Sequence, residues 1–126
     1  MNPSPPPSGA LADAVRAVLE DFYDRVFADA MIGFFFEGQD KKRLVDRETE
    51  LALVMFGVQG ASYTGRPLNV AHARHPIMGG HFARRTQLLA DTLRDHAFSE
   101  ELARRWLEHT EALRPQITEH AGGDCD

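Results

Sequence analysis

Three histidines that lie close together are the first residues in this sequence whose type and spacing could support chemistry. His72, His75 and His81 fall within ten residues, and imidazole is the side chain that most often binds metal ions. His72 and His75 share a helix face, but Pro76 separates them from His81. No carboxylate lies nearby at ligand spacing, so a zinc site or a similar metal site would lack its fourth ligand.

A single axial histidine offers a simpler arrangement. His72 alone would suffice to hold haem iron beside an aromatic-lined pocket, and the chain has eight phenylalanines for such a lining. His75 and His81 would then be surface residues or would support the site from behind.

A carboxylate stands where the helical pattern calls for an apolar side chain. Glu48 interrupts a stripe that runs from Leu44 to Met55, and a carboxylate on a core face is costly unless it is paired or neutral. One interpretation is a protonated, buried side chain that resembles glutamine, and another is a side chain turned to solvent and screened by Arg47 or Lys41. A third is an acid that passes a proton to a bound oxygen species or peroxide.

Two other polar side chains break apolar patterns. Arg85 interrupts the stripe of a later helix, and we expect its guanidinium to reach the surface beside Arg84 or to pair with Glu48 or a cofactor carboxylate. Tyr23 lies among apolar residues, so its hydroxyl should point inward and find a partner. A backbone carbonyl is the alternative partner for that hydroxyl.

The elements that must position these residues are all predicted to be helices, because apolar residues recur every three or four positions. Asp40 and Ser99 have the side chains preferred at helix N-caps. No alternating strand pattern appears, so the fold class predicted is all-α. The expected helices cover residues 10–29, residues 40–56, a short stretch from Pro67 to His75, a long stretch striped by Phe82, Leu89 and Leu93, and a final stretch from Ser99.

Length and composition limit the classes of protein that remain. The 126 residues suit one domain, which we place at 10–118, between a Pro-rich tail at 1–9 and a second tail at 119–126. A net charge of −5 without a basic block argues against nucleic acid or an anionic membrane as partner. No apolar run is long enough for a membrane span and the start does not resemble a signal peptide. The single Cys125 excludes a disulfide scaffold and fits a cytoplasmic protein.

Several blocks of sequence carry a family resemblance. In chain order they are Phe22-Tyr23-Asp24-Arg25-Val26, Phe35-Phe36, Tyr63-Thr64-Gly65-Arg66, His72-Ala73-Arg74, and Ile77 with His81-Phe82. Together they resemble the truncated haemoglobins, and group I most closely, over about residues 10–118. The Tyr-Thr-Gly-Arg loop six residues ahead of His72 is the most specific of them.

The resemblance implies a compact two-over-two globin fold that holds haem b. His72 matches the proximal histidine that binds the iron, and Tyr23 matches the distal tyrosine that hydrogen-bonds a gas ligand. Leu44 and Glu48 match two further distal positions. The remaining matches to haem-contacting positions are Phe35, Phe36, Tyr63, Arg66, His75, Ile77, Phe82 and Leu89.

The sequence also departs from the family pattern. Glu48 replaces the usual glutamine, Arg85 stands where an apolar residue is usual, and His75 stands where leucine is frequent. These departures concern the distal pocket more than the fold.

The resemblance predicts a haem protein that binds dioxygen, nitric oxide or carbon monoxide. Dioxygen held by Tyr23 and a second donor could convert nitric oxide to nitrate, given a reductase to supply electrons, so the sequence leaves open whether the chain is an enzyme. The alternatives are haem-based sensing and a peroxidase-like activity that uses Tyr23, Glu48 and Arg85 as catalytic residues. A monomer or a weak homodimer is expected.

Overall fold

The computed structural model describes residues 8–63 and 79–113. In chain order the elements are α1 (Ser8–Ala28), η1 (Gly33–Phe36), α2 (Lys41–Met55), α4 (Gly79–Asp95) and α5 (Glu100–Ala112). No strand occurs in these two ranges, which confirms the all-α prediction. Within them, no helix combines the length and the apolar character needed to cross a membrane.

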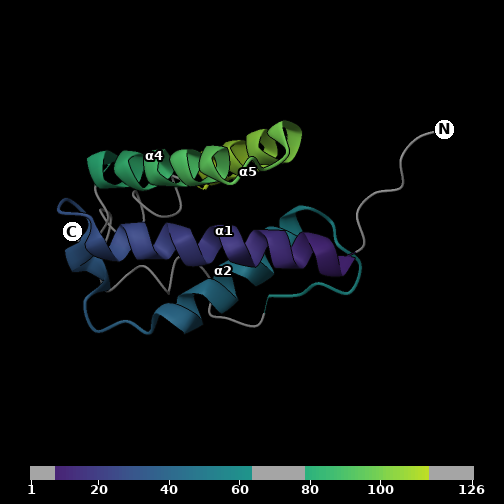
Figure 1. Ribbon diagram of the computed structural model, residues 1–126, viewed down its shortest axis with the longest axis horizontal. Coiled ribbons are helices and arrows are strands. Elements are labelled where there is room, and N and C mark those ends of the chain that lie inside the picture. The colour runs from purple at the N-terminus through teal and green to yellow at the C-terminus, as the bar shows by residue number, and fades with distance from the viewer. Residues whose placement is uncertain (1–7, 64–78, 114–126) are drawn as a thin grey trace, which may run out of the picture.

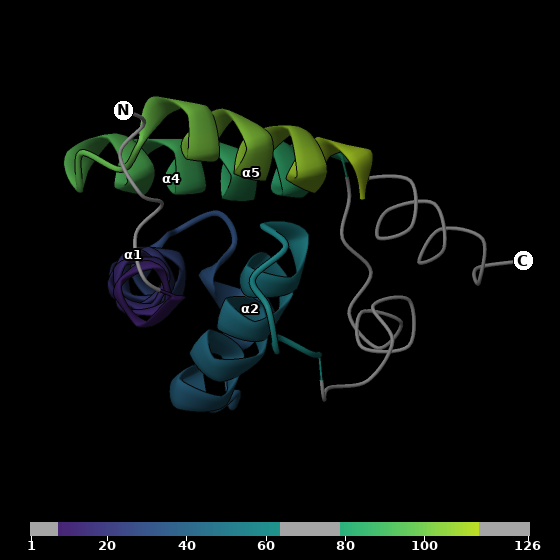
Figure 2. The same ribbon diagram turned by 90° about the vertical axis from the view of Figure 1, so that its right-hand side faces the viewer.

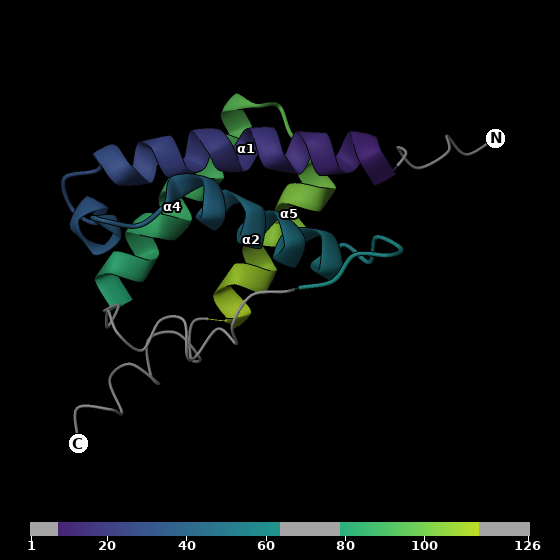
Figure 3. The same cartoon turned by 90° about the horizontal axis from the view of Figure 1, so that it is seen from below.

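The four long helices form two layers. Figure 1 shows α4 and α5 running above α1, with α2 beneath, and Figure 2 shows the upper pair lying over the lower pair. Figure 3 gives the same layers from below, with α1 and α2 nearer to the viewer. Helix α1 packs against both α2 and α4, and α2 also contacts α5, so the two layers meet chiefly through α1.

Local side-chain chemistry explains where the helices begin. The Asp40 carboxylate accepts a hydrogen bond from the Arg43 backbone N–H and caps α2, and the Ser99 hydroxyl accepts one from Leu102 N–H and caps α5. Both caps were predicted from the sequence. Helix α1 begins at Ser8, so it takes in the last two residues of the stretch that the sequence assigned to the tail.

The core is built chiefly from one side of α1. Val15, Val18, Leu19, Phe22 and Val26 are buried there, and they pack with buried residues of the other helices. Those residues include Val45 and Ala52 of α2, Leu88, Leu89 and Leu93 of α4, and Trp106 of α5.

The buried face of α2 is not the predicted one. The sequence favoured a stripe from Leu44 through Glu48 to Met55, but the fully buried side chains are Val45, Thr49 and Ala52. The two rows differ by one residue, or about 100° of helix rotation, and the row with threonine and alanine is the less apolar by sequence. Because α1 covers the second row, the predicted stripe lies on an adjacent, half-buried side of α2.

Gly33 allows η1 to fold tightly against the end of α1. A Cβ atom at this position would lie 2.8 Å from the Phe27 carbonyl oxygen and 3.3 Å from that of Val26. Only glycine fits so close to another backbone. The turn brings the phenylalanines of η1 next to α1, and Phe36 meets Tyr23 there with ring centroids 6.0 Å apart.

Candidate functional site

Three helices bring their polar residues together inside the apolar core. Tyr23 comes from α1, Glu48 from α2 and Arg85 from α4. The Tyr23 hydroxyl donates to Glu48 Oε1 at 3.3 Å, and Arg85 Nη2 donates to the same oxygen at 2.5 Å. We call these three residues the polar triad.

Tyr23 is held in place by aromatic rings. It is 3% exposed, and its ring stands edge-on to Phe22, Phe36 and Phe27 at centroid distances of 5.0, 6.0 and 6.5 Å. Burial, and then the negative charge of Glu48, raises the pKa of Tyr23 well above its ordinary value. The hydroxyl therefore keeps its proton and remains a hydrogen-bond donor, and the expected inward direction of Tyr23 is confirmed.

Glu48 and Arg85 form a largely buried ion pair. Their side chains are 24% and 15% exposed, and the Arg85 guanidinium carbon lies 5.0 Å from the centroid of the Phe22 ring. Burial lowers the pKa of Arg85, but attraction to Glu48 and Tyr23 more than offsets it, so the pKa lies above its ordinary value. Arg85 therefore binds the Glu48 carboxylate through a short, charge-assisted hydrogen bond.

One expectation about Glu48 was wrong. Its side chain is not turned to solvent beside Arg47 or Lys41, because Glu48 pairs with Arg85, Arg47 pairs with Glu50 and Lys41 pairs with Asp24.

Arg85 does not reach the surface beside its neighbour. Arg84 pairs instead with Asp29 at 2.7 Å, while Arg85 turns inward to Glu48. Pairing with Glu48 was one of the expectations for Arg85, and it is the one that the structure bears out.

The other predicted site residues divide into three groups. Phe35, Phe36 and Leu44 are half-buried and pack against the main core. Phe36 lies next to Tyr23 of the polar triad. Leu89 is fully buried within that core, whereas Phe82 packs with Leu113 in a second cluster. Tyr63 is half-buried in the segment after α2. His72, His75, Arg66 and Ile77 lie outside the described residues.

From the sequence, His81 was considered as a metal ligand, as a surface residue or as a support for the site, but not as a residue that contacts haem. Its ring stands edge-on to Phe35 at 4.9 Å and to Phe34 at 6.1 Å, and its Nδ1 atom is buried without a hydrogen-bond partner in the described part of the chain. A buried ring nitrogen normally has a hydrogen-bond partner, either a donor or an acceptor. Only the position of His81 directly before Phe82 could have suggested this place.

The residues in these ranges fit a flat apolar group that carries polar substituents, as haem does. Half-buried apolar side chains from η1 and α2 are available to cover it, and His81 Nδ1 offers it a polar contact. No cluster of three metal-binding side chains occurs within residues 8–63 and 79–113. The three-histidine alternative includes two residues outside those ranges and stays untested.

Comparison with known proteins identifies the family. The family model described as bacterial-like globin matches residues 9–119. The chain belongs to the bacterial-like globin family. It is also 31% identical, over 111 residues, to the group 1 truncated hemoglobin GlbN of Mycolicibacterium paratuberculosis, covering 88% of this chain and 81% of that protein. The resemblance to truncated haemoglobins is thus confirmed, and haem-based binding of a small gas follows from membership.

Solved structures confirm the two-over-two fold of this truncated globin. The 2/2 hemoglobin from Synechococcus sp. PCC 7002, in the cyanomet state and with covalently attached heme, matches with a TM-score of 0.77 and 23% identity, over 86% of this chain and 92% of that chain. The truncated hemoglobin from Tetrahymena pyriformis, Fe(III) form, matches with a TM-score of 0.74 and 22% identity, over 84% and 90% of the two chains.

The Tetrahymena protein has also been solved as three single variants. In one a tyrosine is changed to phenylalanine, and in each of two others a glutamine is changed to glutamate. Along that protein the three positions lie 21 and then 4 residues apart, which are the intervals between Tyr23, Leu44 and Glu48 in this chain.

Proposed function

We propose that this truncated globin binds haem b through His72 and binds a diatomic gas, dioxygen or nitric oxide, on the side of Tyr23, Leu44 and Glu48. The observation that carries the proposal is the polar triad, in which a buried tyrosine hydroxyl meets Glu48 and Arg85 inside an apolar core. The matching intervals in the Tetrahymena protein support the same three positions.

When bound, haem would supply an iron with an open coordination position for the gas. The residues of the chain do the rest. Phe36 and Leu44 provide apolar surface that excludes water, and Tyr23 holds its proton at a fixed place beside them. Arg66, by its charge, and Tyr63, by its hydroxyl, would bind the haem propionates.

Conversion of nitric oxide to nitrate belongs to the same proposal. One nitric oxide and one dioxygen contain all the atoms of nitrate, and one electron completes its charge. A reductase must therefore supply one electron for each nitrate formed. The single Cys125 favours a reducing cytoplasm as the place for this chemistry.

The ion pair disfavours the peroxidase-like alternative in the form in which Glu48 gives a proton to a bound oxygen species. In that role Glu48 would have to face the bound species, but Arg85 at 2.5 Å and the Tyr23 hydroxyl at 3.3 Å both engage its carboxylate. Gas binding is the function that this geometry favours.

An absorption spectrum tests the proposal directly. Purified wild type, His72→Ala and a control, His109→Ala, would be loaded with haem and measured as ferric protein and as ferrous protein with carbon monoxide. His109 lies on an exposed part of α5. We expect sharp Soret bands in wild type and the control, and a lost or displaced band in His72→Ala.

Two results would contradict the proposal: no haem uptake by wild type, or an unchanged spectrum in His72→Ala. Extraction into acidified acetone then identifies the haem. Haem b leaves the protein, whereas a haem attached covalently, as in the Synechococcus protein, stays with it.

A further inference from the structure

Tyr23 has one hydroxyl hydrogen, and the structure shows which group receives it. The hydroxyl donates to Glu48 Oε1 at 3.3 Å. A phenol has a single donor and otherwise only lone pairs. While this hydrogen bond exists, Tyr23 has no hydrogen to give to a ligand beside it.

Arg85 is a second donor to the Glu48 carboxylate. Its guanidinium keeps its charge at any ordinary pH, and it donates to the same carboxylate oxygen that receives the Tyr23 hydrogen. A glutamine at this position would carry an amide N–H₂ that could donate to the Tyr23 oxygen, and the tyrosine hydrogen would then be free. With the Glu48–Arg85 pair the Tyr23 hydroxyl is the donor, whereas with a glutamine it could be the acceptor.

The surrounding rings fix this arrangement. Phe22 lies beneath the Arg85 guanidinium and also stands edge-on to Tyr23. Phe36 and Phe27 contact the other parts of the Tyr23 ring. Neither the Tyr23 ring nor the Arg85 guanidinium can turn away without disturbing this aromatic packing.

Stability alone does not account for a buried pair at this place. Replacing a buried ion pair by apolar side chains is often neutral or stabilising, so such a pair is weak evidence of a stabilising role. The charges here converge on a tyrosine that lies in the proposed gas-binding pocket, which points to a role in ligand binding.

We propose that the Glu48–Arg85 pair determines gas specificity by withholding the Tyr23 hydrogen, so that the pocket favours weakly polar gases, nitric oxide and carbon monoxide, over dioxygen. This inference rests on the proposed function. Dioxygen held in such a pocket gathers negative charge and gains from a hydrogen-bond donor, whereas the other two gases gain little. Glu48 and Arg85 act as positioning residues, and their effect passes through Tyr23.

The test compares the affinities for dioxygen and carbon monoxide in the haem-loaded wild type and in Glu48→Gln, Tyr23→Phe and the double variant. Glu48→Gln should raise dioxygen affinity roughly tenfold, the effect of one net hydrogen bond, and leave carbon monoxide affinity nearly unchanged. Tyr23→Phe should change the ratio of affinities less than about twofold in wild type but reverse the whole gain in Glu48→Gln.

Infrared spectra of the carbon monoxide complexes give a readout that does not depend on affinity. The C–O stretch should fall in Glu48→Gln, because a donor then faces the ligand, and it should return in the double variant. Arg85→Lys, which keeps a cation, should stay nearer to wild type than Arg85→Met. Arg84→Met is the matched control, because Arg84 faces Asp29 instead of the triad, and it should leave the ratio of affinities unchanged.

The outcomes separate this inference from the proposed function. If wild type binds carbon monoxide but Glu48→Gln leaves the ratio of affinities unchanged, the inference alone fails. It also fails if Tyr23→Phe lowers dioxygen affinity tenfold in wild type, or if Arg85→Met lowers it, since Tyr23 or Arg85 would then donate to the gas directly. If wild type takes up haem but binds no gas, both proposals fall.

Discussion

Two neighbouring arginines of α4 form ion pairs that differ in kind. Arg84 pairs with Asp29 at 2.7 Å, and the two side chains are 40% and 7% exposed, whereas Arg85 pairs with Glu48 at 2.5 Å, and those side chains are 15% and 24% exposed. The Asp29 carboxylate also accepts hydrogen bonds from the Met31 and Ile32 backbone N–H groups. Arg84 thus supports a turn of the chain, while Arg85 supports the position of a proton on Tyr23.

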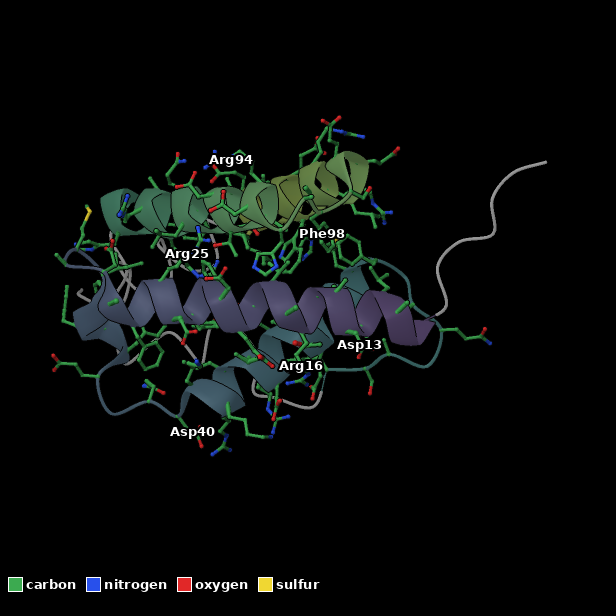
Figure 4. The ribbon with its side chains drawn as sticks, in the orientation of Figure 1. Asp13, Arg16, Arg25, Asp40, Arg94 and Phe98 are labelled. Atoms are coloured by element: carbon green, nitrogen blue, oxygen red, sulfur yellow. The ribbon has the colours of Figure 1, made fainter. Side chains whose placement is uncertain are left out.

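The difference teaches that the surroundings of an ion pair, more than its length, decide what it does. The Arg84 guanidinium holds the pKa of Asp29 below its ordinary value and stabilises the loop after α1. A comparable exposed network joins α1 to the end of α4, where Arg25 bonds both Asp21 and Asp95. Figure 4 shows Arg25 on the side of α1 that faces the upper layer.

Removing Arg85 should have the largest effect on stability. Arg85→Met leaves the half-buried Glu48 carboxylate without its cation and with only the Tyr23 hydroxyl as partner, which should lower the free energy of unfolding by about 2–4 kcal/mol, allowing for partial exposure. Urea unfolding at neutral pH measures the loss.

A double variant sharpens this prediction. Arg85→Met combined with Glu48→Gln removes both charges and should recover most of the stability. A double variant no more stable than Arg85→Met would mean that the guanidinium contributes through its packing on Phe22. The two arginines would then differ in their packing contacts and not in their ion pairs.

Alkaline pH should reveal the proton on Tyr23. The pKa of Tyr23 is raised in the folded protein. The stability that Tyr23 contributes is therefore fully present below the pKa of an unfolded tyrosine, about 10, and is lost as the pH rises above it. Above that value the free energy of unfolding should fall by about 1.4 kcal/mol per pH unit from this residue alone. Tyr23→Phe should remove that slope, and unfolding at several pH values from 9 to 12 measures the difference. Parallel curves for the two proteins would contradict the burial of the proton.

The smallest effect should come from Arg84. Arg84→Ala should lower the unfolding midpoint by roughly 3 °C at low salt, as measured by calorimetry. At 1 M NaCl the Debye length is about 3 Å, so this difference should shrink, while the loss in Arg85→Met should persist. An Arg84→Ala difference that did not change with salt would remove the distinction between a pair whose arginine is exposed and a pair whose arginine is buried.

Much of the fold could be predicted because its signals are local. The cap residues Asp40 and Ser99 each act within three residues of sequence, and the helical periods need no knowledge of partners. The buried face of α2 was missed because choosing Val45 and Ala52 over Leu44 requires knowing where α1 lies.

The site was predictable to the extent that a residue broke a pattern. Tyr23, Glu48 and Arg85 all stood out in that way, but Glu48 and Arg85 are 37 residues apart, and only tertiary packing decides that they meet. His81 was noticed as a member of the three-histidine cluster, but its packing against Phe35 was not predicted, because a histidine near the start of a helix looks like an ordinary surface residue until its tertiary neighbours are known.

The tight turn at Gly33 restricts how this chain can diverge. Its position takes no part in the proposed chemistry, yet a single added methyl group there would press on the Phe27 backbone at 2.8 Å. Any of the nineteen replacements would displace the three phenylalanines that follow, and with them the ring that faces Tyr23. Over evolutionary time this glycine should accept fewer changes than many of the buried side chains. A core leucine can be replaced by another apolar residue of similar size, whereas every replacement of glycine adds a Cβ atom.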